Sequence, residues 1–496
     1  MKKNNIPRIL KRYDFANKMK ISQLNSSKFI LPSGDLDIVK LRTNWNPWEV
    51  DTFAIQSVLS SNEYQFKNFK IDSADKKFNQ IMREIRDSQF GSIPNNTNHS
   101  DFAKEFILVT ALTQFSLQEN SALKYFRYKY IFNFKSENLD MESIFFNKFK
   151  SNYDDFIKFS VITSFIYSSQ FIDKNIRLEE FALFLDEKIM SHLIIDRDNF
   201  IEYQEDYSDE DSLDVTSFNF FYKFPFIKYL GEVYLPLPHT VREAVTASLL
   251  TRVTAGDNAL RALVGLEVME SYLLYIMNTN AKFDQIEQEY KYTFKRNEKR
   301  TVDLMLRQCN QYILIDSKLM MPKQTLRNLD DKEIDYTINR LSESVKQVYL
   351  HATKKFNIEY NPFTLNESTF DENILRNNIF GIVVVFSDSF IQRNLIYSEV
   401  CKKLNIEIHS KEYEYLISHI KVLSLYEFEK MTLGGYDLFE LFKSHISNNS
   451  TWNDFTLIQD SSTLVNQDVN HLKDIITFTE KCLLDFVNDF ELQSNL

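Results

Sequence analysis

Between residues 257 and 430, amphipathic helical segments alternate with short, continuous apolar runs, and this order limits the folds that the chain can form. A helix that begins at Asp257 or Asn258 precedes three β-branched and aromatic runs, EYKYTFKR, TVDLMLR and YILIDSKL. A long helix, a strand in NIFGIVVVFSD, a helix around IYSEVCKKL and a strand-to-helix segment, HIKVLSLYEFEKM, follow. Apolar strands alternating with helices predict a mixed sheet covered on both faces, which is an α/β fold.

The rest of the chain is predicted to be mainly helical, which makes the protein α+β overall. Residues 1–215 show apolar positions at helical spacing and are expected to form a region for recognition, regulation or assembly. Residues 216–434 are expected to form the sheet domain, with its core at about 257–430, and residues 435–496 a helical tail. The acidic stretch 202–215 reads as a solvated loop or domain boundary, with a DNA-mimicking or regulatory segment as the alternative.

Composition narrows the class of protein. The formal net charge of −11 over 496 residues excludes whole-surface attraction to nucleic acid, so any such contact needs a local basic groove or a bound metal. Three widely spaced cysteines match no zinc pattern and fit a reduced compartment. The basic N-terminus lacks an apolar core behind it, and no apolar run approaches about 18 residues. We therefore expect a soluble, cytoplasmic protein that does not contact a membrane.

Two carboxylates and a lysine interrupt the apolar runs between residues 302 and 319. Asp303 heads the first run, and Asp316 and Lys318 end the second. A buried carboxylate is unfavourable by several kcal/mol unless it is paired, protonated or bound to a metal. The short turn RQCNQ allows antiparallel pairing, and strand alternation places Asp316 and Lys318 on one side with Ser317 on the other. The pattern predicts a hard-oxygen site for Mg²⁺ or Mn²⁺.

The segment TVDLML…ILIDSKL resembles the PD-(D/E)xK nuclease superfamily, which has the restriction-endonuclease-like fold. The signature of that family is an acid on one strand and acid-x-Lys on the next, which here are Asp303, Asp316 and Lys318. The family core also has the order helix, three strands, helix, strand. Val302 stands where the family usually has Pro, and Asp316 replaces the more common Glu. The resemblance covers about residues 257–430.

The resemblance implies a catalytic role for each of these residues. Asp303 and Asp316 would bind one or two Mg²⁺ or Mn²⁺ ions, with the carbonyl of Ser317 as a further ligand. Lys318 would orient or activate the water that attacks the phosphate in line. Glu270, on the helix before the strands, would assist the metal directly or through water.

Two further assignments involve the flanking helices. Glu267, one turn before Glu270, is the alternative for the helix glutamate. The helix after the lysine strand supplies Gln347, which would hold the lysine or a phosphate. His351 stands where some members of the family carry Tyr in a Q-x-x-x-Y helix. An exposed helix face is the alternative for Gln347 and His351.

A basic segment, KYTFKRNEKR, lies between the first two expected strands. Its Lys295, Arg296, Lys299 and Arg300 are candidates for binding the phosphate backbone beside the acidic site. The alternative is a solvated hairpin tip.

The function that these features favour is a Mg²⁺-dependent endonuclease, with DNA favoured over RNA as the substrate. A nuclease fused to a helical region is often a bacterial restriction or anti-phage defence effector, so a homodimer or a defence-system partner protein is expected. Two alternatives stay open: a non-catalytic scaffold with a nuclease fold, and a toxin-like effector that cleaves RNA. No H-E-x-x-H zinc motif and no phosphate-binding G-x-x-x-x-G-K-[ST] loop is present in the sequence.

Overall fold

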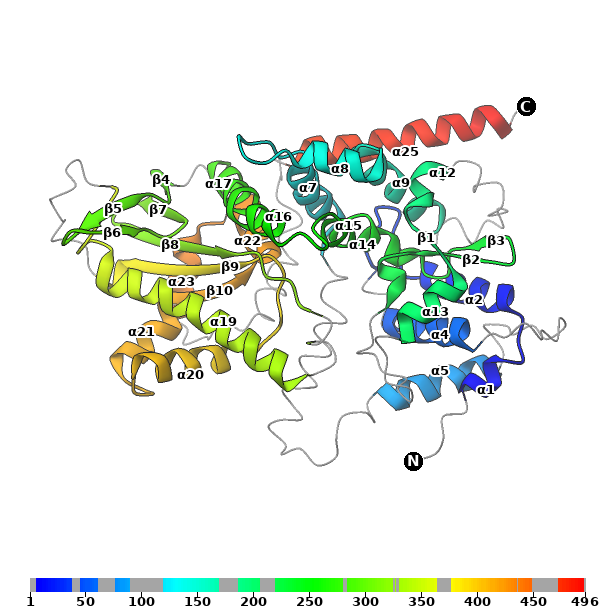
Figure 1. Ribbon diagram of the computed structural model, residues 1–496, viewed down its shortest axis with the longest axis horizontal. Helices are drawn as coiled ribbons and strands as arrows, with labels where there is room; N and C mark the ends of the chain where they lie inside the picture. Colours follow the sequence, from blue (N-terminus) through cyan, green and yellow to red (C-terminus); the bar gives the residue numbers. More distant parts are fainter. Residues whose placement is uncertain are drawn as a thin grey trace. The chain divides into compact units, whose positions relative to one another are not determined.

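The computed structural model describes residues 6–37, 45–60, 76–89, 119–168, 186–205, 219–279, 283–323, 326, 330–363, 376–434, 436–447 and 472–494. They belong to two compact units, Met1–Gly256 with Asp474–Leu496, and Asp257–Lys473 (Figure 1). The first unit is dominated by helices and the second is built on a mixed sheet, which confirms the expected α/β class with helices at both ends of the chain. In the described part of the chain, no helix is long and apolar enough to cross a membrane.

The first unit packs short helices around an aromatic-rich core and one small sheet. Phe15, Phe29, Phe53 and Phe78 are among its fully buried side chains. Its elements are α1 (Ile6–Leu10), α2 (Phe15–Ser27), α4 (Pro47–Leu59), α5 (Lys76–Gln89), α7 (Ser121–Phe132), α8 (Met141–Phe149), α9 (Tyr153–Ile166), α12 (Glu187–Ser191), β1 (Ile194–Asp196), α13 (Arg197–Glu205), η2 (Phe220–Tyr222), β2 (Phe226–Tyr229), β3 (Glu232–Tyr234), η3 (Pro238–Thr240), α14 (Val241–Ala244), α15 (Ala247–Val253) and α25 (Lys473–Ser494).

The boundary between the units falls at Gly256, and not at residue 215 as expected. Strand β2 pairs with β1 in parallel and with β3 in antiparallel, so backbone hydrogen bonds join residues on both sides of position 215 into one sheet. Within the acidic stretch, residues 202–205 end helix α13, and residues 206–215 lie outside the described residues.

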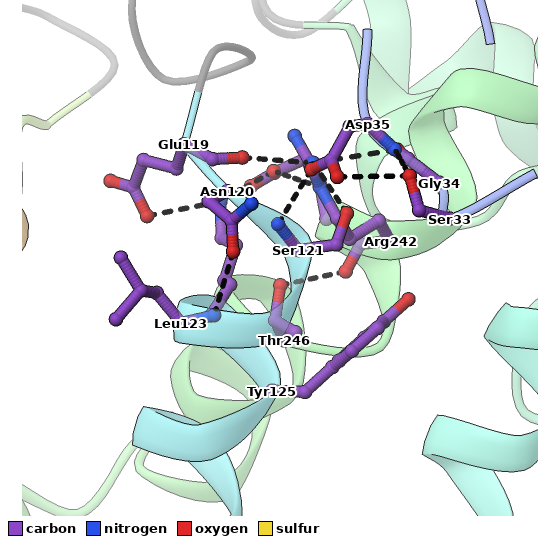
Figure 2. Close-up of polar contacts among 12 residues, drawn as sticks. Ser33, Gly34, Asp35, Glu119, Asn120, Ser121, Leu123, Tyr125, Arg242 and Thr246 are labelled. Atoms are coloured by element: carbon purple, nitrogen blue, oxygen red, sulfur yellow. Dashed lines mark hydrogen bonds and ion pairs between the residues drawn. The ribbon is translucent and has the colours of Figure 1, made fainter. Parts of the chain in front are cut away.

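A buried ionic cluster also holds residues 240–246 in the first unit (Figure 2). Arg242 Nη1 donates hydrogen bonds to the carbonyl oxygen of Glu119 at 2.9 Å and to Ser121 Oγ at 3.0 Å, and it lies 3.4 Å from Asp35 Oδ1. Lys124 forms ion pairs with Glu119 and Glu243. Because each side chain finds its partner on a different segment, the cluster fixes α14 against α7 and the loop around Asp35.

The expected C-terminal tail is divided between the two units. Helix α23 (Leu438–Ser447) packs on the sheet of the second unit, where Phe439 and Phe442 contact the ring of Phe380. Helix α25 belongs to the first unit, where Phe486 contacts Phe165 of α9. Aromatic packing therefore joins the two halves of the tail to different cores, and residues 435–496 do not form a separate part.

The second unit is centred on a five-stranded sheet with the order β10-β9-β8-β7-β4. Its strands β4, β7 and β8 pair in antiparallel, and β8, β9 and β10 pair in parallel. Its elements are α16 (Asn258–Leu263), η4 (Val264–Met269), α17 (Glu270–Asn278), β4 (Gln285–Gln288), β5 (Lys291–Phe294), β6 (Asn297–Arg300), β7 (Leu304–Gln308), β8 (Gln311–Lys318), α19 (Asp331–Leu350), η5 (His351–Lys355), η6 (Arg376–Asn378), β9 (Ile379–Val385), α20 (Arg393–Leu404), α21 (Lys411–His419), β10 (Ile420–Ser424), α22 (Leu425–Leu433) and α23.

Helices cover both faces of this sheet, as predicted. Successive residues of a strand point to opposite faces, and β9 shows both contacts. Gly381 lies against Val348 of α19, and a Cβ atom at this glycine would lie only 2.3 Å from Val348 Cγ1. Phe380, the preceding residue, contacts α23 on the opposite face. Figure 1 shows α19 along one side of the sheet, with α20 packed on it.

One of the three strands expected between residues 289 and 319 does not join the sheet. The second and third are β7 and β8, but KYTF forms β5, which pairs with β6 as a separate hairpin. The turn of this hairpin, Lys295–Arg296, has two left-handed residues with φ of 50° and 68°, as a two-residue type I′ turn requires. The sheet position next to β7 is taken by β4, a strand that was not predicted.

Candidate active site

A cavity of about 660 Å³ opens in the second unit where β7 begins and β8 ends. Helical residues before the strands form one wall, and the first half of α19 forms another. Gly265 allows the close approach of the first wall, because a Cβ atom there would lie 3.2 Å from Leu319 Cβ. The cavity lining includes Glu270, Glu289, Asp303, Ser317, Lys318 and Tyr336.

Strand pairing brings the two predicted carboxylates together. The register of β7 and β8 pairs Leu304 with Ile315, so the next position along places Asp303 beside Asp316. Lys318 Nζ lies 2.7 Å from Asp316 Oδ2, as the predicted alternation of side chains requires. Asp303, Asp316 and Lys318 therefore meet at one end of the sheet.

Asp316 is buried deeply for a charged residue, with an exposed fraction of 1%. Burial and the neighbouring charge of Asp303 raise the pKa of Asp316 above its usual range, and the ion pair with Lys318 opposes the rise. The carboxylate thus has one cation beside it and a second carboxylate nearby, an arrangement that leaves negative charge uncompensated.

Glu270, and not Glu267, lines the cavity. Burial raises the pKa of Glu270 to about 8, with a further contribution from the charges of Asp303 and Glu289, while Lys318 opposes the rise. A π-helical turn, η4, lies directly before Glu270, and such turns often occur at functional sites.

The carboxylate oxygens of the site are suitable ligands for a hard divalent cation, but they do not converge on one point. In the described part of the chain, no three His, Cys, Asp or Glu side chains are arranged to hold a metal ion as they stand. Asp303 Oδ2 accepts hydrogen bonds from the backbone N–H of Ser317 at 2.6 Å and from Ser317 Oγ at 2.8 Å. Carboxylate oxygens are the donors that Mg²⁺ and Mn²⁺ prefer, and a cation would offset the repulsion that raises the pKa of Glu270. Sharing one ion would require Asp303 and Asp316 to exchange their present partners for it.

Basic side chains line the cavity beside its carboxylates. Arg261, Arg300, Lys323 and Arg340 all line the cavity and are exposed. Arg300 pairs with Glu289 at 3.2 Å and Lys323 with Glu333 at 2.9 Å. Cations around a carboxylate cluster suit a ligand that carries several negative charges, such as a phosphate backbone.

The four residues of the predicted basic segment have different surroundings. Arg300 lines the cavity, but Lys299 is held by Glu359, with its Nζ 2.8 Å from Oε2. Lys295 and Arg296 form the exposed hairpin tip and are not part of the cavity lining. Of this segment, only Arg300 lies at the candidate site.

Gln347 is not placed at the site. Its side chain is exposed and lies outside the cavity lining, seven residues beyond Arg340, which is about 10 Å along the helix. His351 is buried, and its Nδ1 lies 2.8 Å from the hydroxyl of Tyr360. Burial lowers the pKa of His351 to about 3, so this histidine is a neutral core residue. The cause is the packing of α19 on the sheet, which buries Val345 and Val348 and turns Gln347 outward.

Sequence reasoning missed Glu289, Arg261, Tyr336 and Arg340, all of which line the cavity. Glu289 lies at the site because its backbone N–H donates to the carbonyl oxygen of Asp303 on the neighbouring segment. Finding it required the pairing of β4 with β7. The other three are exposed helical residues, and no local pattern distinguishes them from an ordinary solvated face.

Comparison with protein-family models found no family that matches the chain. Curated proteins and solved structures likewise gave no match. The resemblance to PD-(D/E)xK nucleases therefore stays a prediction based on Asp303, Asp316 and Lys318.

Proposed function

We propose that the chain is a metal-dependent nuclease that hydrolyses phosphodiester bonds of nucleic acid, with DNA as the favoured substrate. The observation that carries the proposal is the pairing of Asp303 beside Asp316, with Lys318 Nζ 2.7 Å from Asp316. Asp303 and Lys318 line a cavity with a basic rim, and Asp316 is buried beside them. Two carboxylates and a lysine at this spacing supply the groups that metal-assisted hydrolysis of a phosphodiester requires.

Each residue of the site has a defined task in this proposal. Asp303, Asp316 and Glu270, with the carbonyl of Ser317, would hold Mg²⁺ or Mn²⁺. The bound cation would supply charge neutralisation at the phosphoryl and leaving oxygens. Lys318 would hold the attacking water by a hydrogen bond and orient it for in-line attack on the phosphate. The ion pair with Asp316 keeps the ammonium group of Lys318 directed at the two carboxylates.

The basic rim would position the substrate. Arg300 and Lys323 already neutralise Glu289 and Glu333, so they are oriented by ion pairs before any substrate binds. Arg261, on α16, and Arg340, on α19, add positive charge to the cavity lining. We place such a nuclease in bacterial restriction or anti-phage defence in the cytoplasm, acting as a homodimer or with a partner protein.

One observation favours a non-catalytic scaffold as the second candidate. Asp303 accepts hydrogen bonds from Ser317, and Asp316 forms an ion pair with Lys318. Both carboxylates therefore interact with protein groups and not with a shared cation. A scaffold would retain the basic rim and bind nucleic acid without cutting it. Cleavage of RNA in place of DNA is a third outcome, because the same groups act on either phosphodiester.

The test is a digestion with purified full-length protein. The substrates are supercoiled plasmid, linear duplex, single-stranded DNA and RNA, each with Mg²⁺, Mn²⁺ or EDTA. The variants are Asp316→Ala and Lys318→Ala, with Lys346→Ala as the matched control. Lys346 and Lys318 have the same side-chain exposure of 30%, and Lys346 pairs with Glu343 outside the cavity. The proposal expects metal-dependent cutting that is lost in both site variants and kept in the control. Cutting that both site variants retain would exclude this site.

A further inference from the structure

An exposed aromatic side chain stands among the cations at the rim of the cavity. Tyr336, on α19, is 46% exposed and lines the cavity. Lys323 Nζ lies 4.6 Å from the centre of its ring, and Arg340 Cζ lies 5.7 Å from it. An exposed tyrosine is common on protein surfaces. Here, however, the ring offers a surface on which a base can stack, and the two cations beside it can bind phosphate. Together they supply the contacts that a nucleotide makes.

Lys323 is paired with Glu333, whereas the charges of Arg340 and Arg261 are available to a ligand. Among the described residues, no carboxylate forms an ion pair with Arg340 or with Arg261. Arg340 contacts the Tyr336 ring, and Arg261 lies on the helical wall. Leu266, which is 51% exposed, adds an apolar side chain to the helical wall of the cavity. The two walls therefore each present an apolar surface with an arginine beside it.

The depth and size of the site favour an unpaired strand. A volume of about 660 Å³ lies in the range of pockets that enclose a single small ligand. Asp316 is almost wholly buried, so a phosphate must enter the cavity to approach it. In a duplex the bases stack on each other and cannot reach a ring on the protein, whereas a single strand can turn a base outward.

We propose that Tyr336, with Arg340 and Lys323, forms a stacking platform that selects an unpaired DNA strand at this site. The inference rests on the proposed nuclease function and specifies its substrate class. The base stacks on the Tyr336 ring, the two cations bind the adjacent phosphates, and the next phosphate along the strand is directed toward Asp303, Asp316 and Lys318.

The experiment is a binding measurement by fluorescence anisotropy with the full-length chain in EDTA. The probes are a labelled oligothymidylate and a blunt duplex of the same length. The variants are Tyr336→Ala and Tyr336→Trp, with Tyr275→Ala as the control. Tyr275 is 43% exposed in the same unit and lies outside the cavity lining, so it matches Tyr336 in exposure.

The expected result is tighter binding of the single strand than of the duplex by the unaltered protein. Tyr336→Ala weakens single-strand binding by about tenfold, Tyr336→Trp retains it, and Tyr275→Ala leaves it unchanged. Equal affinity for the two probes, or a Tyr336→Ala variant that binds the single strand as the unaltered protein does, overturns the inference.

Failure of this inference is distinguishable from failure of the proposed nuclease, because binding is measured without a divalent metal. A chain that binds as expected but cuts no substrate supports the platform and contradicts the nuclease. A chain that cuts duplex faster than single strands, at a rate that Tyr336→Ala does not change, contradicts the platform alone.

Discussion

Each unit holds a cluster of charged side chains, and the clusters differ in their balance of charge. Around Arg242, the cations Lys124, Arg127 and Arg242 face the carboxylates of Asp35, Glu119 and Glu243. At the candidate site, Glu270, Glu289 and Asp303 line the cavity and Asp316 is buried beside Asp303. Lys318 pairs with Asp316, and Arg300 pairs with Glu289. The first cluster is matched and the second has an excess of carboxylates.

Carboxyl pKa values reflect this difference. Burial acts to raise the pKa of Glu119, but the charges of Lys124, Arg127 and Arg242 outweigh it, and the pKa is lowered. For Glu270, burial and other carboxylates act in the same direction, and the pKa is raised to about 8. A matched cluster stabilises a fold, whereas a cluster with excess charge of one sign is typical of a site that binds a ligand of the opposite sign.

Removal of a cation from the matched cluster should give the largest loss of stability. Arg242→Met leaves Asp35, Glu119 and Glu243 short of a partner in a buried position, so we expect a loss of about 3–5 kcal/mol in the free energy of unfolding. Urea denaturation followed by circular dichroism measures it. Lys135→Met, which breaks an exposed pair with Glu142, should change stability by less than about 1 kcal/mol. Similar losses for both variants would show that the Arg242 cluster is not a stabilising contact.

The candidate site should respond to a divalent cation, and the Arg242 cluster should not. Saturation with Mg²⁺ at about 100 times its dissociation constant should stabilise the protein by about 2.7 kcal/mol. Asp316→Asn should abolish this gain, because it removes a charged ligand. Thermal unfolding with and without Mg²⁺ measures both. An Asp316→Asn variant that Mg²⁺ stabilises as much as the unaltered protein would place the metal elsewhere.

The raised pKa of Glu270 predicts how stability depends on pH in the metal-free protein. The folded-state pKa of about 8 exceeds the ordinary value of 4.5, so the folded protein holds this proton more tightly than the unfolded chain. The associated stability is present below pH 4.5 and is lost as the pH rises toward 8. Glu270→Gln should remove this component, so that its melting temperature falls less between pH 5 and 8 than that of the unaltered protein. The measurement is a series of melts in EDTA, and parallel curves for the two proteins would contradict the prediction.

The smallest effect is expected at the rim. Arg340→Gln should remove one phosphate contact and lower the slope of log affinity against log salt by about 1 for single-stranded DNA. Lys332→Gln is the control, because Lys332 lies on the same helix outside the cavity lining. A slope that does not change in Arg340→Gln would show that this arginine does not contact phosphate.

Much of the sheet domain was predictable from local pattern. Strands β7, β8 and β9 were identified because continuous apolar residues fill them, and α19 because its apolar residues recur at helical spacing. Pairing of β7 with β8 followed from the short turn between them. Strand β4, QIEQ, was missed because none of its residues is fully buried and its pattern carries no strong apolar signal.

The sequence by itself determined that Asp303, Asp316 and Lys318 come together. Asp303, Asp316 and Lys318 lie within sixteen consecutive residues that form one hairpin, so turn length and strand alternation suffice to bring them together. Short-range geometry of this kind is set by backbone rules alone.

Tertiary structure alone decided which helical residues line the cavity beside them. Gly381 admits Val348 close to β9, and this contact sets the rotation of α19, so that Tyr336 and Arg340 face the cavity and Gln347 faces outward. Rotation of a helix about its axis depends on side chains that are distant in sequence and interlock in the core. The same long-range packing assigned residues 216–256 to the first unit, because β1, which pairs with β2, and Asp35, which lies beside Arg242, precede residue 215.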